Sequence, residues 1–466
     1  MTATDLNALY RPPRPRPLPA LAALVRTIAQ GDGDLLSLLP ASAYQVPLGF
    51  LGYSRRSIAI VNAPEHLRTI MTEATDIYPK SDLMVGALGP LVGESSFVSA
   101  GDTWRRQRRM LDPAFSHMRL TRAFGAMVAA VDDYEDYLHG LADTGETLSL
   151  DLAMSHLTAD VICRTVFSTS LKSEIAREVF EDFTLFERSV AQVEVRRLIL
   201  DPAWTETPQK PEPQAACDRI RRRLGELLDT HFDPDSAYND IASACVHAAD
   251  PQDGRRFTRE ELIDELGVFF LAGHETTASV LTWVFFILSV RPDVRERLRQ
   301  EVSAVVGDGP VTMEATRQLA FTRAVFKETL RLYPPLTFIP RVAAETTRIG
   351  TQKIRKGALI MISPWTLHRN PAYWPNPDAF DPDRFLGGRE KTHVPGAYIP
   401  FGQGPRICIG AGFAQVESTL ILARLVRAFD FAVESPERVT PCARLTTRPR
   451  EQIKVRVARR GPLGRS

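Results

Sequence analysis

The sequence predicts a mainly α-helical protein with a small β-rich portion, and three observations lead to this fold class. Helical hydrophobic periodicity dominates the chain after residue 61. Short β-like runs bounded by turns are confined to residues 44–61 and 354–385. One apolar helix near the middle of the chain would be about 48 Å long at ~1.5 Å per residue, enough to cross a whole domain.

Residues 1–19 are expected to form an extended arm. From Arg11 to Pro19 this segment carries five prolines and three arginines, a composition that favours polyproline-like backbone over a helix. It lacks the basic start and the apolar run of a signal peptide or membrane anchor. The five cysteines are scattered and never spaced C-x-x-C, which fits a reducing compartment. We therefore expect no transmembrane anchor and a cytoplasmic location.

Two strands are expected within residues 44–61, with a turn at 51–54. Helices follow, interrupted by a proline-rich stretch at 201–213. The longest helix should begin at Thr258, where Glu261 completes a capping-box pattern, and extend to Ser289. Its apolar centre would fit a membrane span or a buried core helix. Glu275 favours burial in protein, because a mid-membrane carboxylate costs about 2.5–3.5 kcal/mol.

The segment FGQGPRICIG, residues 401–410, carries the strongest chemical signal. A lone cysteine is usually a small buried hydrophobe. Cys408, however, directly precedes a predicted helix, whose N-terminal amides and dipole favour a thiolate, the form that binds metal. Arg406 adds a cation beside it. Glycines occur at Gly402, Gly404 and Gly410. Because they lack side chains, a flat ligand could approach the backbone there.

Competing interpretations fit less well. A phosphate-binding G-x-G-x-x-G fails because Ile407 or Gln415 stands where the third glycine belongs. HETTA, residues 274–278, lacks the second histidine of a zinc protease, since Ala278 stands there. His231 and Asp233 resemble the H-x-D of non-haem iron enzymes, but a solvated helix end is favoured. The formal charge of +1 gives no sign of a nucleic-acid partner.

These features together resemble the cytochrome P450 superfamily, haem-thiolate monooxygenases of the soluble bacterial type, over most of the chain. The ligand loop matches F-x-x-G-x-R-x-C-x-G at every fixed position. Further similar motifs are E-x-x-R at Glu328 and Arg331, P-D-R-F at 382–385 with aspartate where glutamate is commoner, AGHETT at 272–277, and W-x-x-x-R at Trp104 and Arg108. The resemblance implies a triangular-prism P450 fold in one catalytic domain over residues 20–460.

The resemblance also implies a role for each residue. Cys408 would be the thiolate ligand of the iron in haem b, held between the long central helix and the ligand loop. Thr276 and Glu275 would organise proton delivery. A buried triad fixing the ligand loop would comprise Glu328, Arg331 and Arg384. Cofactor-binding residues, including cations for two propionates, would be Trp104, Arg108, Ala272, Arg341, Phe401, Gly402, Arg406 and Gly410. The apolar substrate pocket would be lined by Phe269, Leu336, Thr337, Phe338 and Ile339, with segments 81–100 and 200–213.

The implied reaction inserts one oxygen atom from O2 into an apolar organic substrate by hydroxylation or epoxidation. Electrons would come from a separate ferredoxin or flavodoxin with its reductase, because too little chain follows Cys408 for a flavin domain. Arg105, Arg106 and Arg109 would attract this acidic partner, unless they form only a solvated helix face. Two alternatives stay open: a haem-thiolate gas or redox sensor without turnover, and a peroxide-driven peroxygenase.

Overall fold

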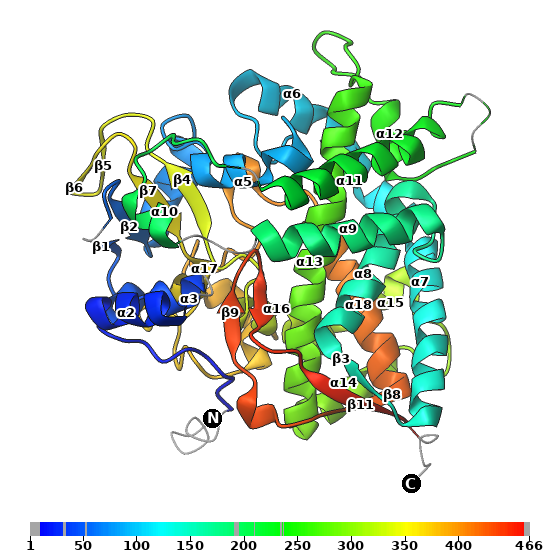
Figure 1. The fold of residues 1–466 in the computed structure, drawn as a ribbon. Coiled ribbons are helices and arrows are strands. Elements are labelled where there is room, and N and C mark those ends of the chain that lie inside the picture. Colours follow the sequence, from blue (N-terminus) through cyan, green and yellow to red (C-terminus); the bar gives the residue numbers. More distant parts are fainter. Residues whose placement is uncertain are drawn as a thin grey trace.

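A long central helix organises the molecule (Figure 1). The computed structural model describes residues 10–460 except 31–33, 52–53, 191–194, 209, 234 and 236. The central helix is α13, Arg259–Val290, and its N-terminus is a capping box in which Thr258 and Glu261 exchange side-chain to backbone hydrogen bonds. By length and composition α13 could cross a membrane, but 83% of its most apolar window is buried inside the protein. The expected core helix is therefore confirmed.

Most of the other helices lie around α13 on one side of the molecule, whereas several lie beside the strands on the other side (Figure 1). Those preceding it are α2 (Ala20–Gln30), α3 (Leu35–Leu38), α4 (Pro64–Arg68), α5 (Asp82–Val92), α6 (Gly101–Leu111), α7 (His117–Thr144), α8 (Leu150–Phe167), α9 (Glu174–Val190), α10 (Val195–Leu200), α11 (Pro211–Asp229) and α12 (Ile241–Val246). Those following it are α14 (Pro292–Val305), α15 (Met313–Gln318), α16 (Ala320–Leu332), α17 (Pro364–Leu367) and α18 (Ala411–Ala428).

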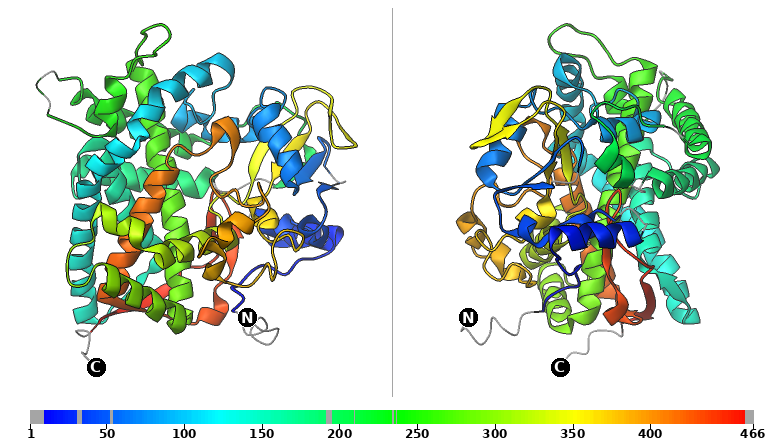
Figure 2. Two further views of the ribbon diagram at one scale, coloured as in Figure 1. Left: turned by 180° about the vertical axis from the view of Figure 1, so that it is seen from behind. Right: turned by 60° about the vertical axis from the view of Figure 1, so that its left-hand side comes forward.

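A four-stranded sheet lies on the opposite side, as both views of Figure 2 show. Its order is β1-β2-β7-β4, with β2 and β7 parallel and the outer pairs antiparallel. These strands are β1 (Leu48–Leu51), β2 (Ile58–Val61), β4 (Ile339–Val342) and β7 (Leu359–Ile362). Both inner strands are fully buried, as expected of apolar runs covered on two faces. The two strands expected within residues 44–61 are confirmed, although the turn at 52–53 lies outside the described residues.

Smaller sheets complete the β structure. A three-stranded sheet has the order β3-β11-β8, and two hairpins pair β5 with β6 and β9 with β10. The strands are β3 (Thr147–Ser149), β5 (Thr347–Ile349), β6 (Gln352–Ile354), β8 (Phe429–Val433), β9 (Pro441–Ala443), β10 (Thr447–Pro449) and β11 (Lys454–Arg459). The β9–β10 hairpin is fixed to the central helix, because Ser279 Oγ and Trp283 Nε1 both donate to the Thr447 carbonyl at 2.8 Å.

The described part of the N-terminal arm, residues 10–19, is extended apart from an isolated bridge between Leu18 and Pro40. It lies against the helical body: the Tyr333 hydroxyl donates to the Pro13 carbonyl at 2.6 Å, and Arg14 pairs with Asp378 at 2.8 Å. These contacts hold the described part of the arm in place. Residues 1–9 lie outside the described part of the chain.

Candidate active site

Cys408 lies at the end of a tight loop immediately before α18. The loop closes on itself, because the Cys408 amide donates to the Phe401 carbonyl at 2.9 Å. Gly402 and Gly404 both adopt φ 73°, the left-handed region that favours glycine. A Cβ atom on Gly404 would stand 2.3 Å from the Met71 carbonyl oxygen, so a side chain there would collide with backbone. The loop geometry therefore requires these glycines.

The sulfur of Cys408 is deep in the protein and yet accessible. The other four cysteines are buried, whereas Cys408 is exposed. Because protein nevertheless surrounds Cys408, its sulfur faces an internal opening. Burial raises the pKa of the Cys408 thiol, while a hydrogen bond from the Gly410 amide and the charge of Arg108 lower it. Arg108 also donates to the Ile407 carbonyl at 2.8 Å. A cation bound to the sulfur would favour the thiolate further.

Three cations converge beside this loop. Lys80 and Arg341 face each other across an isolated antiparallel bridge, and Arg406 acts on both. Burial and its two cationic neighbours hold the pKa of Lys80 well below its usual value. Burial, then Arg406, lowers the pKa of Arg341 to about 10, and burial also lowers that of Arg406 to about 10. Among the described residues, none of the three forms an ion pair with a carboxylate.

Enclosed cations without ion-pair partners are costly. We call Lys80, Arg341 and Arg406 the cationic cradle, and its charge fits a dianion. The two propionates of a haem have that charge, and the accessible sulfur of Cys408 is a suitable iron ligand. The residues present thus fit a haem. Trp104 supports the cradle, since the Arg406 guanidinium lies 4.4 Å from the centre of a Trp104 ring. Lys80 was not expected from the sequence, because a single lysine in an ordinary segment gives no signal.

The opposite wall comes from α13. Ala272, Gly273 and Thr276 are the half-buried positions in a stretch of α13 that is otherwise buried, and their spacing places them on one helix face. Ala272 and Ile409, the residue after Cys408, pack against the same hydrophobic cluster. The Thr276 hydroxyl donates to the Ala272 carbonyl at 2.7 Å, so its oxygen lone pairs can accept a hydrogen bond from the opening.

The expected triad is formed. Arg331 donates to both oxygens of Glu328 at 2.7 Å, and both side chains are completely buried. Arg384 Nε lies 3.4 Å from Glu328 Oε1. Arg331 also donates to backbone carbonyls at His368 and Ala379, both at 2.8 Å. A bidentate pair with its remaining donors satisfied can be stable in the interior.

His368 connects the triad to the ligand loop. Burial, followed by the charge of Arg331, lowers the pKa of His368 to about 3, so its ring stays neutral. Its Nε2 atom accepts a hydrogen bond from the Ile399 amide at 2.9 Å, and the Ile399 carbonyl accepts one from Gly402 at 3.0 Å. A continuous set of hydrogen bonds therefore extends from Arg331 to the loop that carries Cys408.

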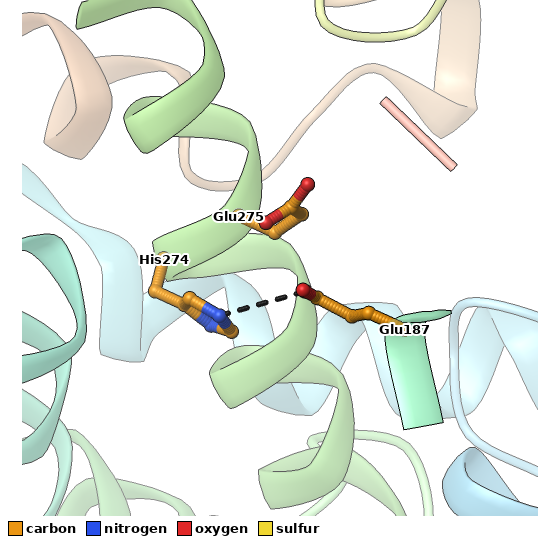
Figure 3. A group of neighbouring side chains, drawn as sticks. All are labelled: Glu187, His274 and Glu275. Carbon is orange, nitrogen blue, oxygen red and sulfur yellow. Dashed lines mark ion pairs between the residues drawn. The ribbon is translucent and has the colours of Figure 1, made fainter. Parts of the chain in front are cut away.

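Glu275 has hydrogen-bond partners that the sequence did not reveal, and two further neighbours, Glu187 and His274, are drawn with it in Figure 3. Arg448 of β10 bonds both of its carboxylate oxygens, and Thr446 donates at 2.5 Å. Burial raises the pKa of Glu275, but Arg448 and Thr446 more than offset this, and the net pKa is lowered. Glu187 of α9 and His274 lie beside it, with ligand atoms of the three residues within 4.8 Å of one another. Glu275 is thus a paired carboxylate, fixed rather than freely open to solvent.

A cavity of about 320 Å³ lies between α5, β4 and the β9–β10 hairpin. Its wall is mostly apolar, and it includes the expected Leu336, Thr337, Phe338 and Ile339, together with parts of the expected segments 81–100 and 200–213. Phe269 is not brought to this wall. It is buried against Phe115, at 5.1 Å between ring centres, because its bulk fills the core next to α6.

The three arginines expected to attract an electron donor are already paired. Arg105 pairs with Asp102 and Arg109 with Asp250, both at 2.9 Å, and Arg106 pairs with Glu261. Carboxylates of this chain therefore offset the positive charge that the sequence suggested for this helix face.

Comparisons with known proteins show the family of the chain. A family model described as Cytochrome P450 matches residues 12–457. Cyclooctatin synthase of Streptomyces melanosporofaciens is 32% identical over 449 residues, covering 95% of this chain and 92% of that protein. Cyclooctat-9-en-7-ol 5-monooxygenase of the same organism is 32% identical, covering 84% and 83%. Leukotriene-B4 omega-hydroxylase 3 of Mus musculus is 30% identical, covering 93% and 86%.

Among solved structures, the haem domain of cytochrome P450DA has a TM-score of 0.83 with this chain at 24% identity, covering 98% of this chain and 99% of that one. The sulfur loop, the cationic cradle and this fold define a haem-thiolate oxidoreductase. The chain belongs to the cytochrome P450 family. The expected family, fold class and enzyme class are confirmed.

Removing one partner of the buried triad should unfold the site. We expect Glu328→Gln to lower the free energy of unfolding by about 3–5 kcal/mol, because Arg331 would keep a buried charge without its counter-ion. Thermal and denaturant unfolding measure this. The matched control is Glu390→Gln, which loses an exposed pair with Lys327 and should cost under about 1 kcal/mol. Equal losses in the two variants would contradict the role of burial.

Lys80→Met should have opposite effects in the two forms of the protein. Without haem it should raise the free energy of unfolding by about 1–2 kcal/mol, since one unpaired enclosed charge is removed. With haem it should weaken cofactor affinity about tenfold, since one charge-assisted contact to a propionate is lost. Unfolding curves and haem transfer to apomyoglobin test this. The exposed Lys353→Met is the control, and unchanged haem affinity in Lys80→Met would contradict the assignment.

Proposed function

We propose that this protein is a monooxygenase that binds haem b through Cys408 and inserts one oxygen atom from O2 into an apolar organic substrate by hydroxylation or epoxidation. The observation that carries the proposal is the pairing of an accessible sulfur with a polar pair, Glu275 and Thr276, on an otherwise apolar helix. Relatives named as a monooxygenase and a hydroxylase support the same class of reaction.

When bound, haem supplies the redox chemistry of oxygen activation and transfer. The chain's own residues do the remaining work. The amide of Gly410 would stabilise the thiolate of Cys408, and Lys80, Arg341 and Arg406 would hold the propionates. Thr276 presents its hydroxyl oxygen as a hydrogen-bond acceptor, and Glu275 stands next to it in the chain as a carboxylate able to take up and release a proton.

The cavity favours a hydrophobic substrate. Apolar side chains of α5 and of residues 336–340 make up most of the wall, so they would exclude water from the reacting carbon. Electrons would come from a separate ferredoxin or flavodoxin with its reductase in the cytoplasm. Since Arg105, Arg106 and Arg109 are paired, attraction to that partner must depend on further surface groups. The rate at which the partner reduces this protein should therefore respond only weakly to ionic strength.

The two alternatives differ in what they require. A sensor without turnover has no use for a polar pair on an apolar helix, so the presence of Glu275 and Thr276 favours an enzyme. A peroxide-driven enzyme takes its oxygen, electrons and protons from the peroxide. Product formation with NADPH, reductase and ferredoxin under air, compared with product formation from hydrogen peroxide alone, separates all three.

Cys408→Ser should abolish the thiolate signature in the carbon monoxide difference spectrum of the reduced protein. An alcohol oxygen is far more basic than a thiolate and would remain protonated, so the axial ligand would change. The control is Cys163→Ala, at a buried cysteine on α8, which should retain the signature. A Cys408→Ser protein that kept it would assign the ligand to another residue.

Thr276→Ala should retain haem and substrate binding but lower the product formed per NADPH consumed about tenfold, because proton delivery loses its organising hydroxyl. The control is Thr282→Ala, six residues further along α13. Its hydroxyl also donates to the carbonyl four residues earlier, but it is buried in the core. A ratio unchanged in Thr276→Ala would remove this residue from catalysis.

A further inference from the structure

Glu187 and His274 are titratable groups beside Glu275 that the proposed reaction does not yet use (Figure 3). Glu187 comes from α9, and its side chain is 19% exposed, whereas that of His274 is 2% exposed. Glu187 is therefore the more exposed of the two titratable groups that lie beside the buried Glu275. The Glu187 Oε1 atom itself is buried and accepts no hydrogen bond from the described residues.

The surroundings of Glu187 show which partner must carry a proton. His274 Nδ1 lies 2.6 Å from the Phe270 carbonyl, which can only accept, so Nδ1 carries the ring hydrogen. In a neutral ring, Nε2 then presents a lone pair toward Glu187 Oε1 at 3.5 Å. Burial lowers the pKa of His274, which keeps the ring neutral. Glu187 thus faces two acceptors, His274 Nε2 and the Glu275 carboxylate.

We propose that Glu187 is protonated at neutral pH and is the outer residue of a proton relay that continues through Glu275 to Thr276. The proposal rests on the proposed monooxygenase function. A carboxylate facing two acceptors would be repelled, whereas a carboxylic acid can donate to either. Glu187 acts through Glu275 and is therefore a positioning residue.

Arg448 determines which of the two carboxyls holds the proton. It bonds both oxygens of Glu275, and it also donates to Ser155 Oγ at 2.9 Å. The charge of Glu275 is thereby balanced, while the pKa of Glu187 is raised well above its usual value, first by burial and then by Glu275. The charged and titratable groups facing Glu187 are His274 and Glu275 of α13 and Arg448 of β10; Asp151 of α8 acts on Arg448.

The relay step conserves charge and protons. The O–H bond of Glu187 breaks and one forms on Glu275, across a distance within 4.8 Å that a single water molecule can bridge. Glu187, left as a carboxylate, takes a proton from water at its exposed edge. Glu275 then releases its proton toward Thr276 and returns to its ion pair with Arg448.

The same three side chains could be mistaken for a metal site. Two carboxylates and an imidazole are suitable ligands for Zn²⁺. Arg448, however, already occupies both oxygens of Glu275, and its positive charge would repel a divalent ion. A proton on Glu187 satisfies the same geometry without displacing Arg448.

The first test observes the proton directly. Infrared spectra of wild type and Glu187→Gln at pH 7.5 should differ by the loss of a protonated carboxyl band, which shifts in D2O. The control is Glu181→Gln, at an exposed position of the same helix, which should retain that band and lose only carboxylate absorption. Loss of a carboxylate band in Glu187→Gln, or stoichiometric Zn²⁺ binding that Glu187→Gln abolishes, would overturn the proposal.

The second test observes delivery in the haem-loaded enzyme. Glu187→Gln should lower product per NADPH about three- to tenfold and raise the solvent isotope effect, and Glu187→Asp should restore part of both. Unchanged coupling and isotope effect in Glu187→Gln would overturn the relay. A wild-type protein that formed no product would instead refute the proposed function, while the infrared comparison would still decide whether Glu187 is protonated.

Discussion

The buried pair between Glu328 and Arg331 is the interaction on which the site depends. A sulfur that binds iron must be held deep in the protein on a loop, and loops are the segments that folding fixes least firmly. Here the pair is completely buried, and Arg331 bonds the backbone at His368, whose ring bonds the segment leading into the Cys408 loop. The cost of removing this pair from water is offset only because nearly every N–H donor of Arg331 forms a hydrogen bond.

The cationic cradle imposes the second constraint. Lys80, Arg341 and Arg406 come from three separate parts of the chain. Among the described residues none of them forms an ion pair with a carboxylate, although the charge of Asp76 acts on Arg406. Such an arrangement opposes folding in the free protein and favours it once a dianion binds, so part of the binding energy of the cofactor becomes stability of the fold. Cofactor and fold are therefore linked through charge as well as through the iron ligand.

The sequence predicted the parts of the site whose members are close together in the chain. Glu328 and Arg331 are one helical turn apart, and the ligand loop is a single short segment, so short motifs that resemble those of a known family could indicate them. The relay could not be predicted in the same way. Arg448 is 173 positions from Glu275 and is one arginine in an ordinary strand, so only tertiary folding reveals the pair. Phe269 packs against Phe115 and is not among the residues that line the cavity, because periodicity assigns a helix face but neighbouring packing decides what that face meets.

One element, the β9–β10 hairpin, contributes both to the cavity and to the polar cluster around Glu275. In the β9–β10 hairpin, Arg444 and Leu445 line the cavity, whereas Thr446 and Arg448 bond Glu275. The hairpin is itself fixed to α13 through the Thr447 carbonyl, so a displacement at the cavity wall cannot leave the Glu275 ion pair unaffected. The cavity wall and the Glu275 ion pair are thus connected by at most four residues of backbone, and through this short segment a filled cavity could influence when protons are delivered.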